Sequence, residues 1–316
     1  MPKIYVTLST FAEYGVDPLD ALERGGFPFA INDSGKRMTP KQIVKAAADA
    51  VVLIAGVEAY DAHTLESLPR LKAICRCGAG VDNVDLAYAK AHEIAVFNTP
   101  LHPIEAVAEL TIAMMLALVR RLPEQLLLIR ERQWKRLKTH LLAKRKVGII
   151  GLGKIGRRVV EILKVFGSRV SGFDPYIDKK WAKANGVTLL PLDGLLDTSD
   201  IVTIHASQFQ EAPLRLGAKE IHRMKKGAIL INCARGDMVD EKVLIDALKH
   251  GKLGGAGLDV FEEEPYKGEL TQLNNVVLTP HCGTLTVETR VAMELEAVAT
   301  AVRFLRGDTD FINQIV

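Results

Sequence analysis

The stretch Val147-Gly148-Ile149-Ile150-Gly151-Leu152-Gly153-Lys154-Ile155-Gly156-Arg157 decides the fold of this chain. It contains an apolar run typical of a buried strand, then the pattern Gly-x-Gly-x-x-Gly, then the start of an apolar helical pattern. The first glycine permits a tight turn, the second lets a pyrophosphate approach the backbone, and the third lets helix and strand pack closely. The N-terminus of the helix adds N–H groups and a positive dipole end, which favour bound phosphate.

An acidic residue, Asp174, ends the next apolar run, 23 positions after Gly151. A carboxylate at this place can accept hydrogen bonds from the hydroxyls of an adenosine ribose, and it would repel a 2′-phosphate. Strand, glycines, helix and acid together predict an NAD site and favour NAD over NADP. The alternative for the glycines alone is a tight turn in an unrelated α/β domain.

The bulk composition excludes several classes of protein. With 316 residues, 48% hydrophobic and 25% charged, the chain resembles an ordinary globular protein of one large domain or two. A net charge of +3 without runs of like charge gives no reason to expect nucleic-acid binding. The longest apolar run, Leu110 to Val119, is too short to span a bilayer. The N-terminus lacks the apolar region of a signal peptide.

The four cysteines are dispersed and form no Cys-x-x-Cys pair, so we expect neither a metal site nor a disulfide scaffold. They are Cys75, Cys77, Cys233 and Cys282. A reduced, cytoplasmic protein is the simplest expectation.

Apolar runs alternate with helical patterns along the whole chain, which predicts an α/β fold with parallel sheets covered by helices on both faces. The strands predicted before the glycine motif are 4–8, 27–31, 51–54, 71–75 and 95–97. Those predicted from the motif onward are 146–150, 170–173, 187–189, 201–205, 228–232, 256–260 and 276–278. Five strands before the motif suffice for a separate unit, so we expect two domains.

Several polar residues in the second half follow predicted strands. Arg235 follows 228–232, Asp259 lies near the end of 256–260 with Glu264 shortly after it, and His281 follows 276–278. Because doubly wound sheets bind ligands at the carboxyl ends of their strands, these residues predict a catalytic site at the edge that carries the glycine motif.

The residue types suggest roles in reducing a 2-oxo acid. The guanidinium of Arg235 matches a carboxylate, or a carboxylate and a neighbouring carbonyl; the alternative is a surface arginine. His281 is the best candidate for the proton donor, and His205, with no evident acid beside it, is the second. Glu264 can hold the tautomer of the histidine. Because two more glutamates precede Glu264, the alternative for it is a solvated acidic loop.

Taken together, these segments resemble the D-isomer-specific 2-hydroxyacid dehydrogenase family over nearly the whole chain. The resemblance rests on the glycine motif and, in chain order, on further segments: Gly78-Ala79-Gly80-Val81-Asp82-Asn83-Val84-Asp85, Asn98-Thr99-Pro100, Val107-Ala108-Glu109, Asn232-Cys233-Ala234-Arg235-Gly236, Leu258-Asp259-Val260-Phe261-Glu262-Glu263-Glu264-Pro265 and Thr279-Pro280-His281.

The resemblance implies an oxidoreductase that transfers hydride between NAD(H) and a D-2-hydroxy acid or its 2-oxo acid, such as 3-phosphoglycerate, hydroxypyruvate or glyoxylate. It implies that Arg235 orients the substrate, that His281 is the acid/base with Glu264 as its partner, and that Asp259 contacts the nicotinamide carboxamide. The cofactor-binding set is Gly151, Gly153, Lys154, Ile155, Gly156, Asp174, His205, Ala234 and Asp259. The substrate-binding set is Arg76, Gly78, Ala79 and Gly80, in which the loop amides bind the carboxylate. Arg76 is a candidate for binding a phosphate; its alternative is a solvent-facing arginine.

The resemblance also implies the assembly. The expected domains are a flavodoxin-like substrate domain of residues 1–99 and 286–316, and a Rossmann-type dinucleotide-binding domain of residues 100–285. A homodimer is expected through the cofactor domains, with contacts from the helix at 104–121 and the arm after it. Considered without the resemblance, the pattern at 104–121 predicts a helix buried in the core, because Ala, Leu and Met residues lie nearly all around it.

Departures from the family pattern affect the loops. They are His205-Ala206-Ser207-Gln208-Phe209-Gln210-Glu211-Ala212, Leu101-His102-Pro103 and Cys282-Gly283-Thr284. The alternative function is an NAD-sensing, corepressor-like binding protein that keeps the dehydrogenase fold. The presence of all three residues Arg235, Glu264 and His281 argues against pure binding. An enzyme that oxidises a small oxyanion such as phosphite is a third reading, which nothing in the sequence favours.

Overall fold

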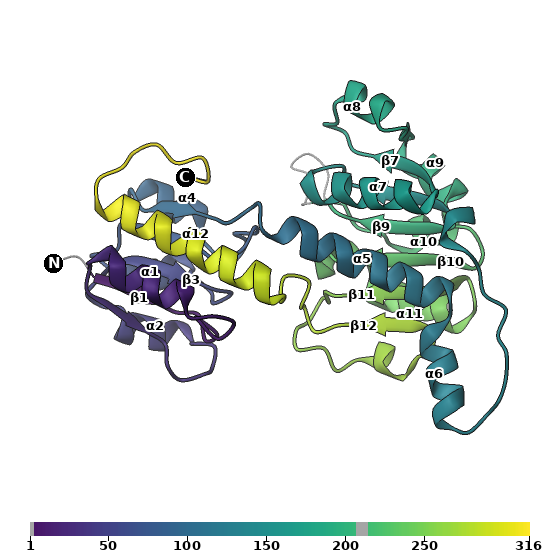
Figure 1. Ribbon diagram of the computed structural model, residues 1–316, viewed down its shortest axis with the longest axis horizontal. Coiled ribbons are helices and arrows are strands. Elements are labelled where there is room, and N and C mark those ends of the chain that lie inside the picture. Colours follow the sequence, from purple (N-terminus) through teal and green to yellow (C-terminus); the bar gives the residue numbers. More distant parts are fainter. Residues whose placement is uncertain (1–2, 207–213) are drawn as a thin grey trace. The chain divides into compact units, whose positions relative to one another are not determined.

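The computed structural model describes residues 3–206 and 214–316 and divides the chain into two compact units (Figure 1). Unit 1 consists of Met1–Pro103 and Thr284–Val316, and unit 2 of Ile104–Gly283. Each unit is built on one parallel sheet, which confirms the predicted α/β fold. Most of the unusual loop that begins at His205 lies outside the described residues.

Unit 1 has a five-stranded sheet with the order β2-β1-β3-β4-β5, and all its neighbouring strands are parallel. The strands are β1 Lys3–Val6, β2 Phe29–Ile31, β3 Ala50–Ala55, β4 Ala73–Arg76 and β5 Ala95–Phe97. The helices are α1 Asp17–Gly25, α2 Pro40–Ala46, α3 Ala62–Glu66, α4 Leu86–Ala91 and α12 Val287–Leu305. Every strand predicted in this part of the chain is present, with ends shifted by up to two residues.

Alternation along β3 shows how this sheet is covered on both faces. Val52 and Ile54 belong to one buried cluster, which contains residues of α1 and α12. Leu53 and Ala55 belong to another, which contains residues of α2, α3 and α4. Because successive side chains of a strand point to opposite faces, one six-residue strand contributes to both cores.

Unit 2 has a seven-stranded parallel sheet with the order β12-β11-β10-β9-β6-β7-β8. Its strands are β6 Lys146–Ile150, β7 Arg169–Phe173, β8 Thr188–Leu189, β9 Ile201–Ile204, β10 Ala228–Asn232, β11 Leu253–Leu258 and β12 Val276–Leu278. Its α-helices are α5 Pro103–Val119, α6 Leu122–Arg130, α7 Lys154–Phe166, α8 Lys179–Ala184, α9 Leu192–Thr198, α10 Ala218–Arg223 and α11 Glu241–Lys249. Short 3-10 helices are η1 Leu142–Lys144, η2 Gly236–Met238 and η3 Glu269–Gln272.

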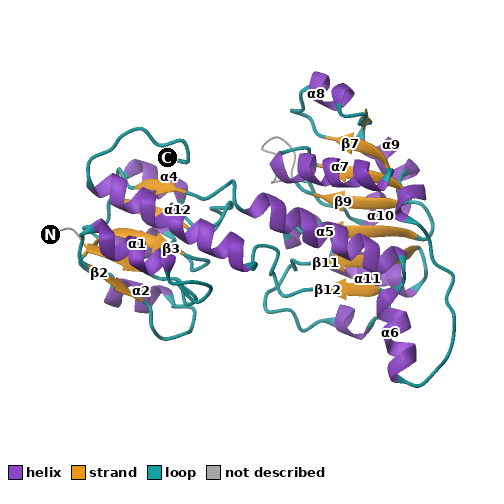
Figure 2. Cartoon of the chain, viewed as in Figure 1, coloured by secondary structure: helices purple, strands orange, loops and turns teal. Residues whose placement is uncertain are grey.

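The strand order of unit 2 indicates at which edge of the sheet a ligand would bind. From β6 the chain adds β7 and β8 on one side, then crosses to add β9, β10, β11 and β12 on the other. Ligands of doubly wound sheets bind at the carboxyl ends of the strands where the order reverses, which here is between β6 and β9. Helices α5 and α7 cover one face, as Figure 2 shows, and their residues share a core cluster with Val147 and Ile149 of β6.

Within residues 3–206 and 214–316, no helix combines the length and the apolar character needed to cross a bilayer.

Two glycines of unit 2 should respond to alanine in opposite ways. A Cβ on Gly148 in β6 would lie 2.4 Å from Ser199 Oγ and 2.5 Å from Leu195 Cδ2, so Gly148→Ala should destabilise unit 2 by about 1–3 kcal/mol. A Cβ on Gly194 in α9 would make ordinary contacts with Pro191 at 3.6 Å, so Gly194→Ala should stabilise the protein by about 0.5–1 kcal/mol. Denaturant unfolding of both variants measures the difference. Equal stability of the two would contradict the close packing of α9 on β6.

Candidate functional site

At each of the three glycines of the motif, a different feature of the structure explains why a glycine stands there. Gly151 has φ +90°, and a Cβ there would lie 2.5 Å from Ala206 N at the end of β9. A Cβ on Gly156 would lie 2.1 Å from Gly151 O, so this glycine lets α7 pack onto the turn. Gly153, the N-cap of α7, has open space where its Cβ would be. That space at a helix N-terminus fits the pyrophosphate of a dinucleotide.

Leu152 lies between the first two glycines, and hydrogen bonds with side chains fix both its N–H and its C=O group. Asp174 Oδ2 accepts a hydrogen bond from Leu152 N–H at 2.8 Å, while Asp174 Oδ1 accepts one from Tyr176 N–H at 2.8 Å. Arg157 Nε donates to Leu152 O at 3.0 Å, and its guanidinium lies 4.6 Å from the ring centre of Trp181. The acidic residue expected at the ribose is therefore fixed to the glycine turn, and Arg157 fixes the same turn from the helix.

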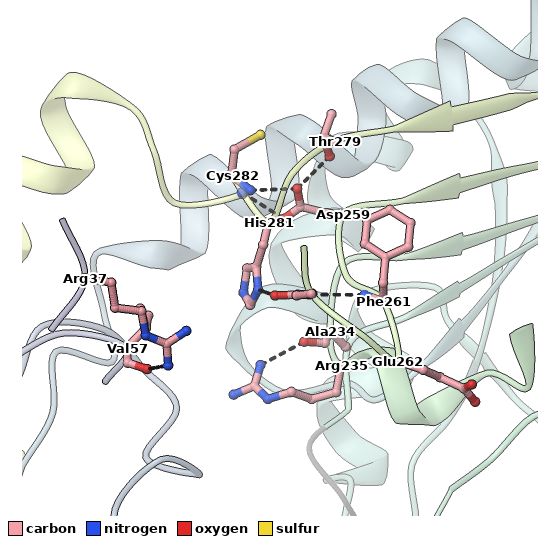
Figure 3. Close-up of polar contacts among 12 residues, drawn as sticks. Arg37, Val57, Ala234, Arg235, Asp259, Phe261, Glu262, Thr279, His281 and Cys282 are labelled. Carbon is pink, nitrogen blue, oxygen red and sulfur yellow. Dashed lines mark hydrogen bonds and ion pairs between the residues drawn. The ribbon is translucent and has the colours of Figure 1, made fainter. Parts of the chain in front are cut away.

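A buried carboxylate organises the turn that carries the candidate histidine. Asp259 is 2% exposed, and its Oδ1 accepts from Thr279 Oγ1 at 2.6 Å and from Cys282 N–H at 2.8 Å. Its Oδ2 accepts from Gly283 N–H at 2.8 Å. These bonds bracket His281, whose φ of +52° is strained for a residue with a side chain. Asp259 thus holds His281 in place, as the labelled residues in Figure 3 show.

His281 is paired with Glu264. The Nδ1 atom of His281 lies 2.8 Å from Glu264 Oε2, and Glu264 Oε1 accepts a hydrogen bond from Phe261 N–H at 3.1 Å. The ring of Phe261 stacks on Tyr266, with ring centres 4.4 Å apart. A carboxylate on Nδ1 favours the tautomer with its proton on Nδ1 and stabilises the imidazolium. It leaves Nε2 available for a reacting group.

The turn that carries Arg235 is ordered by the side chain at the end of β10. Asn232 Nδ2 donates to Arg235 O at 2.8 Å, and Asn232 Oδ1 accepts from Ala234 N–H at 3.0 Å. A Cβ on Gly236 would lie 1.9 Å from Phe261 O, so this glycine lets the Arg235 turn touch the loop that carries Glu264. Figure 3 shows the Arg235 guanidinium and the His281 imidazole on the same side of these strand ends.

His205 lies at the end of β9, against the glycine turn, but its chemistry differs from that of His281. Its Nε2 lies 2.9 Å from Thr203 Oγ1, and Nδ1 is buried with no hydrogen-bond partner among the described residues. Burial lowers the pKa of His205 to about 4. The imidazole is therefore neutral at physiological pH, which makes it a weaker candidate for the proton donor than His281.

In unit 1, two residues after β5 fix the loop 78–80. Gly78 N–H donates to Thr99 Oγ1 at 2.7 Å, Thr99 N–H donates to Gly78 O at 3.0 Å, and Asn98 Nδ2 donates to Ala79 O at 2.7 Å. The amide of Gly78 is thus used within the protein. No described residue accepts a hydrogen bond from Ala79 N–H or Gly80 N–H. These two amides, rather than all three, are the candidates for binding an anion.

Arg76 ends β4 beside this loop. Its Nη1 donates to Cys77 O at 2.8 Å, and a Cβ on Gly78 would lie only 1.2 Å from the same Nη1. The guanidinium thus folds over Gly78 rather than extending into solvent. The φ of Gly78, +145°, adds a second reason for glycine at this position.

The carboxyl edge of the unit 2 sheet collects most of the residues singled out in the sequence. They are Gly151, Gly153, Lys154, Ile155, Gly156, Asp174, His205, Ala234, Arg235, Asp259, Glu264 and His281. Arg76 and Gly78–Gly80 lie at the carboxyl edge of the sheet of unit 1. Across residues 3–206 and 214–316, no three His, Cys, Asp or Glu side chains are grouped so that they could hold a metal ion.

Sequence reasoning missed three roles. Asp259 holds the His281 turn, although only a nicotinamide contact was expected of it, and that contact stays a prediction. Arg157, which was quoted only as the end of the glycine motif, holds Leu152. Asn98 orders the loop 78–80. The signal for Asn98 was its place in Asn98-Thr99-Pro100, directly after a strand.

The chain is similar to proteins of one known family. Residues 112–283 match the family model of the D-isomer specific 2-hydroxyacid dehydrogenase, NAD binding domain. The chain is 39% identical over 277 residues to a D-3-phosphoglycerate dehydrogenase of Methanocaldococcus jannaschii, covering 86% of this chain and 53% of the relative. It is 35% identical over 287 residues to a glyoxylate reductase of Korarchaeum cryptofilum, covering 87% and 86%. The chain thus spans about half the length of the phosphoglycerate dehydrogenase.

Two solved structures share the fold over nearly their whole length. A D-isomer specific 2-hydroxyacid dehydrogenase described as putative, from a Polaromonas species, has a TM-score of 0.88 and 30% identity, with 100% of both chains covered. A D-lactate dehydrogenase from Aquifex aeolicus, complexed with NAD and lactic acid, has a TM-score of 0.84 and 28% identity, with 97% of this chain and 96% of that chain covered.

The depressed pKa of His205 predicts a pH-dependent stability. The unfolded chain binds a proton near pH 6.5, whereas the folded protein resists protonation until about pH 4, so acid favours unfolding across this window. Between pH 7 and pH 5 this one group should remove about 2 kcal/mol of stability. Urea unfolding of the wild type and of His205→Asn at both pH values should show that the variant loses about that much less. Parallel losses in the two proteins would place His205 in a more polar environment.

Proposed function

Because this chain belongs to the D-isomer specific 2-hydroxyacid dehydrogenase family, we propose that it is an NAD-dependent oxidoreductase that interconverts a D-2-hydroxy acid and its 2-oxo acid. The observation that carries the proposal is the 2.8 Å contact between His281 Nδ1 and Glu264 Oε2, at the strand ends that also present Arg235. An imidazole held by a carboxylate, at strand ends that also present an arginine, is suited to proton transfer on a bound oxo acid. The geometry therefore favours the enzyme over the corepressor-like alternative.

The glycine turn and Asp174 would hold the NAD. The open space at Gly153 accommodates the pyrophosphate, and the N-terminus of α7 provides N–H groups for it. Asp174, fixed by two backbone amides, would accept hydrogen bonds from the ribose hydroxyls and repel a 2′-phosphate. When bound, the nicotinamide supplies or accepts the hydride.

Two kinds of group in the chain suit such a substrate. The free amides of Ala79 and Gly80 suit its carboxylate, and the guanidinium of Arg235 suits the carboxylate and the adjacent carbonyl oxygen. Each group that fixes the 2-oxo acid reduces the entropic cost of reaching the reactive geometry. Arg76, folded over the loop that contains these amides, is a candidate for a phosphate in a substrate such as 3-phosphoglycerate.

His281 would move the proton. With Nδ1 held by Glu264, the protonated imidazole can donate from Nε2 to the oxygen on C2 as the oxo acid is reduced. In the oxidative direction, the neutral Nε2 accepts the proton of the hydroxyl. Glu264 stabilises the imidazolium between these steps.

We also propose that the protein is a homodimer assembled through unit 2. Helix α6 has no buried residue in the monomer, although Leu122, Leu126 and Ile129 are 45%, 57% and 57% exposed. The segment after it adds Trp134, 85% exposed. A second copy of the chain would cover these side chains. Helix α5 packs mainly on the sheet of its own unit, so α6 and the segment after it would provide most of the dimer contact.

The four cysteines form no disulfide, which suits a cytoplasmic setting.

Replacing either member of the pair tests the proposed mechanism. We expect His281→Ala to lower kcat by a factor of about 10²–10⁴, the range typical of a lost general acid, and Glu264→Gln to lower it less. Rates of NADH oxidation with glyoxylate, hydroxypyruvate and pyruvate, and of NAD reduction with 3-phosphoglycerate, measure this. His250→Ala is the matched control, because His250 Nδ1 lies 3.0 Å from Asp246 Oδ1 in an exposed pair on the surface. Wild-type rates in His281→Ala would exclude the mechanism.

A charge on α6 tests the dimer. Leu126→Glu combined with Ile129→Glu should shift the protein from dimer to monomer in sedimentation experiments, because it places two carboxylates in an apolar interface. Val165→Glu on α7 is the control, since Val165 is 89% exposed and lies outside the proposed contact. A wild-type monomer, or a dimer that tolerates both glutamates, would contradict this contact surface.

A further inference from the structure

The last residues of the chain run along the open edge of β5. Ile315 N–H donates to Val96 O at 2.7 Å, and Gln314 forms an antiparallel bridge with Phe97. Ile312 is 94% exposed, whereas the polar residue next to it, Asn313, is only 8% exposed. Since burying an amide side chain is costly unless it is hydrogen-bonded, this burial indicates a specific contact.

Asn313 forms hydrogen bonds with both the N–H and the C=O group of Asn98. Asn98 N–H donates to Asn313 O at 3.1 Å, and Asn313 Nδ2 donates back to Asn98 O at 2.8 Å. The same Nδ2 lies 3.3 Å from Thr300 Oγ1 and 3.3 Å from Glu296 Oε1, both on α12. The two peptide groups that flank Asn98 are therefore tied to Asn313, and Asn313 is tied to α12.

The side chain of Asn98 transmits this constraint to the loop 78–80. Asn98 Nδ2 donates a hydrogen bond to Ala79 O at 2.7 Å, whereas Asn98 Oδ1 has no hydrogen-bond partner within the described part of the chain. Ala79 C=O and Gly80 N–H belong to one planar trans peptide and point in opposite directions. Fixing the carbonyl therefore fixes the direction of the Gly80 N–H, one of the two free amides.

We propose that Asn313 is a positioning residue for substrate binding, which acts through Asn98 on the amide of Gly80. Asn313 does not touch the substrate. It keeps the Asn98 backbone in the position from which its side chain reaches Ala79 O. The inference rests on the proposed function, because it takes the loop 78–80 as the binding site of the substrate carboxylate.

The first test compares Asn313→Ala with Gln314→Ala. Gln314 is an exposed carboxamide in the same segment, and its side chain bonds only to Val316 O among the described residues, so it is the matched control. We expect Asn313→Ala to raise the KM for the 2-oxo acid about five- to tenfold, as for the loss of one hydrogen bond, with kcat and the KM for NADH within about twofold. Thr300→Val, which removes only one contact to α12, should raise that KM less than about twofold. An unchanged KM in Asn313→Ala, or an equal rise in Gln314→Ala, would overturn the proposal.

The second test does not need turnover. In Asn313→Ala the amide hydrogens of Gly78 and Thr99, which are bonded to Thr99 Oγ1 and Gly78 O, should exchange about fivefold faster than in the wild type, whereas peptides of β6 should exchange at the wild-type rate. If the wild type turns over none of the 2-oxo acids, the proposed function fails and this experiment alone decides the role of Asn313. Unchanged exchange at Gly78 and Thr99 would then exclude it.

Discussion

The carboxylate of Asp259 is the interaction on which the arrangement of the catalytic edge depends. It is buried, and it accepts three hydrogen bonds from the turn that follows β12. Its own backbone N–H is bonded to Asn232 O at the end of β10. Burying a carboxylate is costly unless its oxygens accept hydrogen bonds. If the turn moved away, Asp259 would lose these hydrogen bonds while still buried, so the carboxylate fixes the position of the turn. The strained backbone of His281 is held by this constraint, and the pairing with Glu264 follows from it.

Much of the fold could be predicted because its signals are local. Every predicted strand is present, and Gly151 and Gly156 form the tight turn and the close packing that their spacing predicts. The main error in a strand position was in β11, which was expected at 256–260 and is observed at Leu253–Leu258. Its start contains two glycines, Gly254 and Gly255, which carry no apolar signal. A Cβ on Gly254 would lie 2.6 Å from Gly227 O, so close packing removes the side chain that would have marked the strand.

The residue types of the site could also be predicted, but its hydrogen-bond network could not. Arg235, Glu264 and His281 stand out because their side chains have distinctive chemistry at strand ends. The roles of Asp259, Arg157 and Asn98 depend instead on which backbone N–H or C=O group each one meets. That depends on how loops from different strands approach one another, which residue spacing does not encode. For the same reason the sequence offered three loop amides for a carboxylate, whereas the fold leaves two.

The return of α12 to unit 1 has a consequence for how this protein is made on the ribosome. Ile4, Val6 and Leu22 share one buried cluster with Met293 and Ala297, so this part of the core needs both segments of unit 1. Unit 2 is one continuous segment and has all its residues earlier in synthesis. Nascent domains usually fold in the order in which they emerge. Here the order is reversed: unit 1 starts before unit 2 and finishes after it, and the apolar face of β1 and β3 that packs against α12 stays uncovered until Val287–Leu305 has been synthesised.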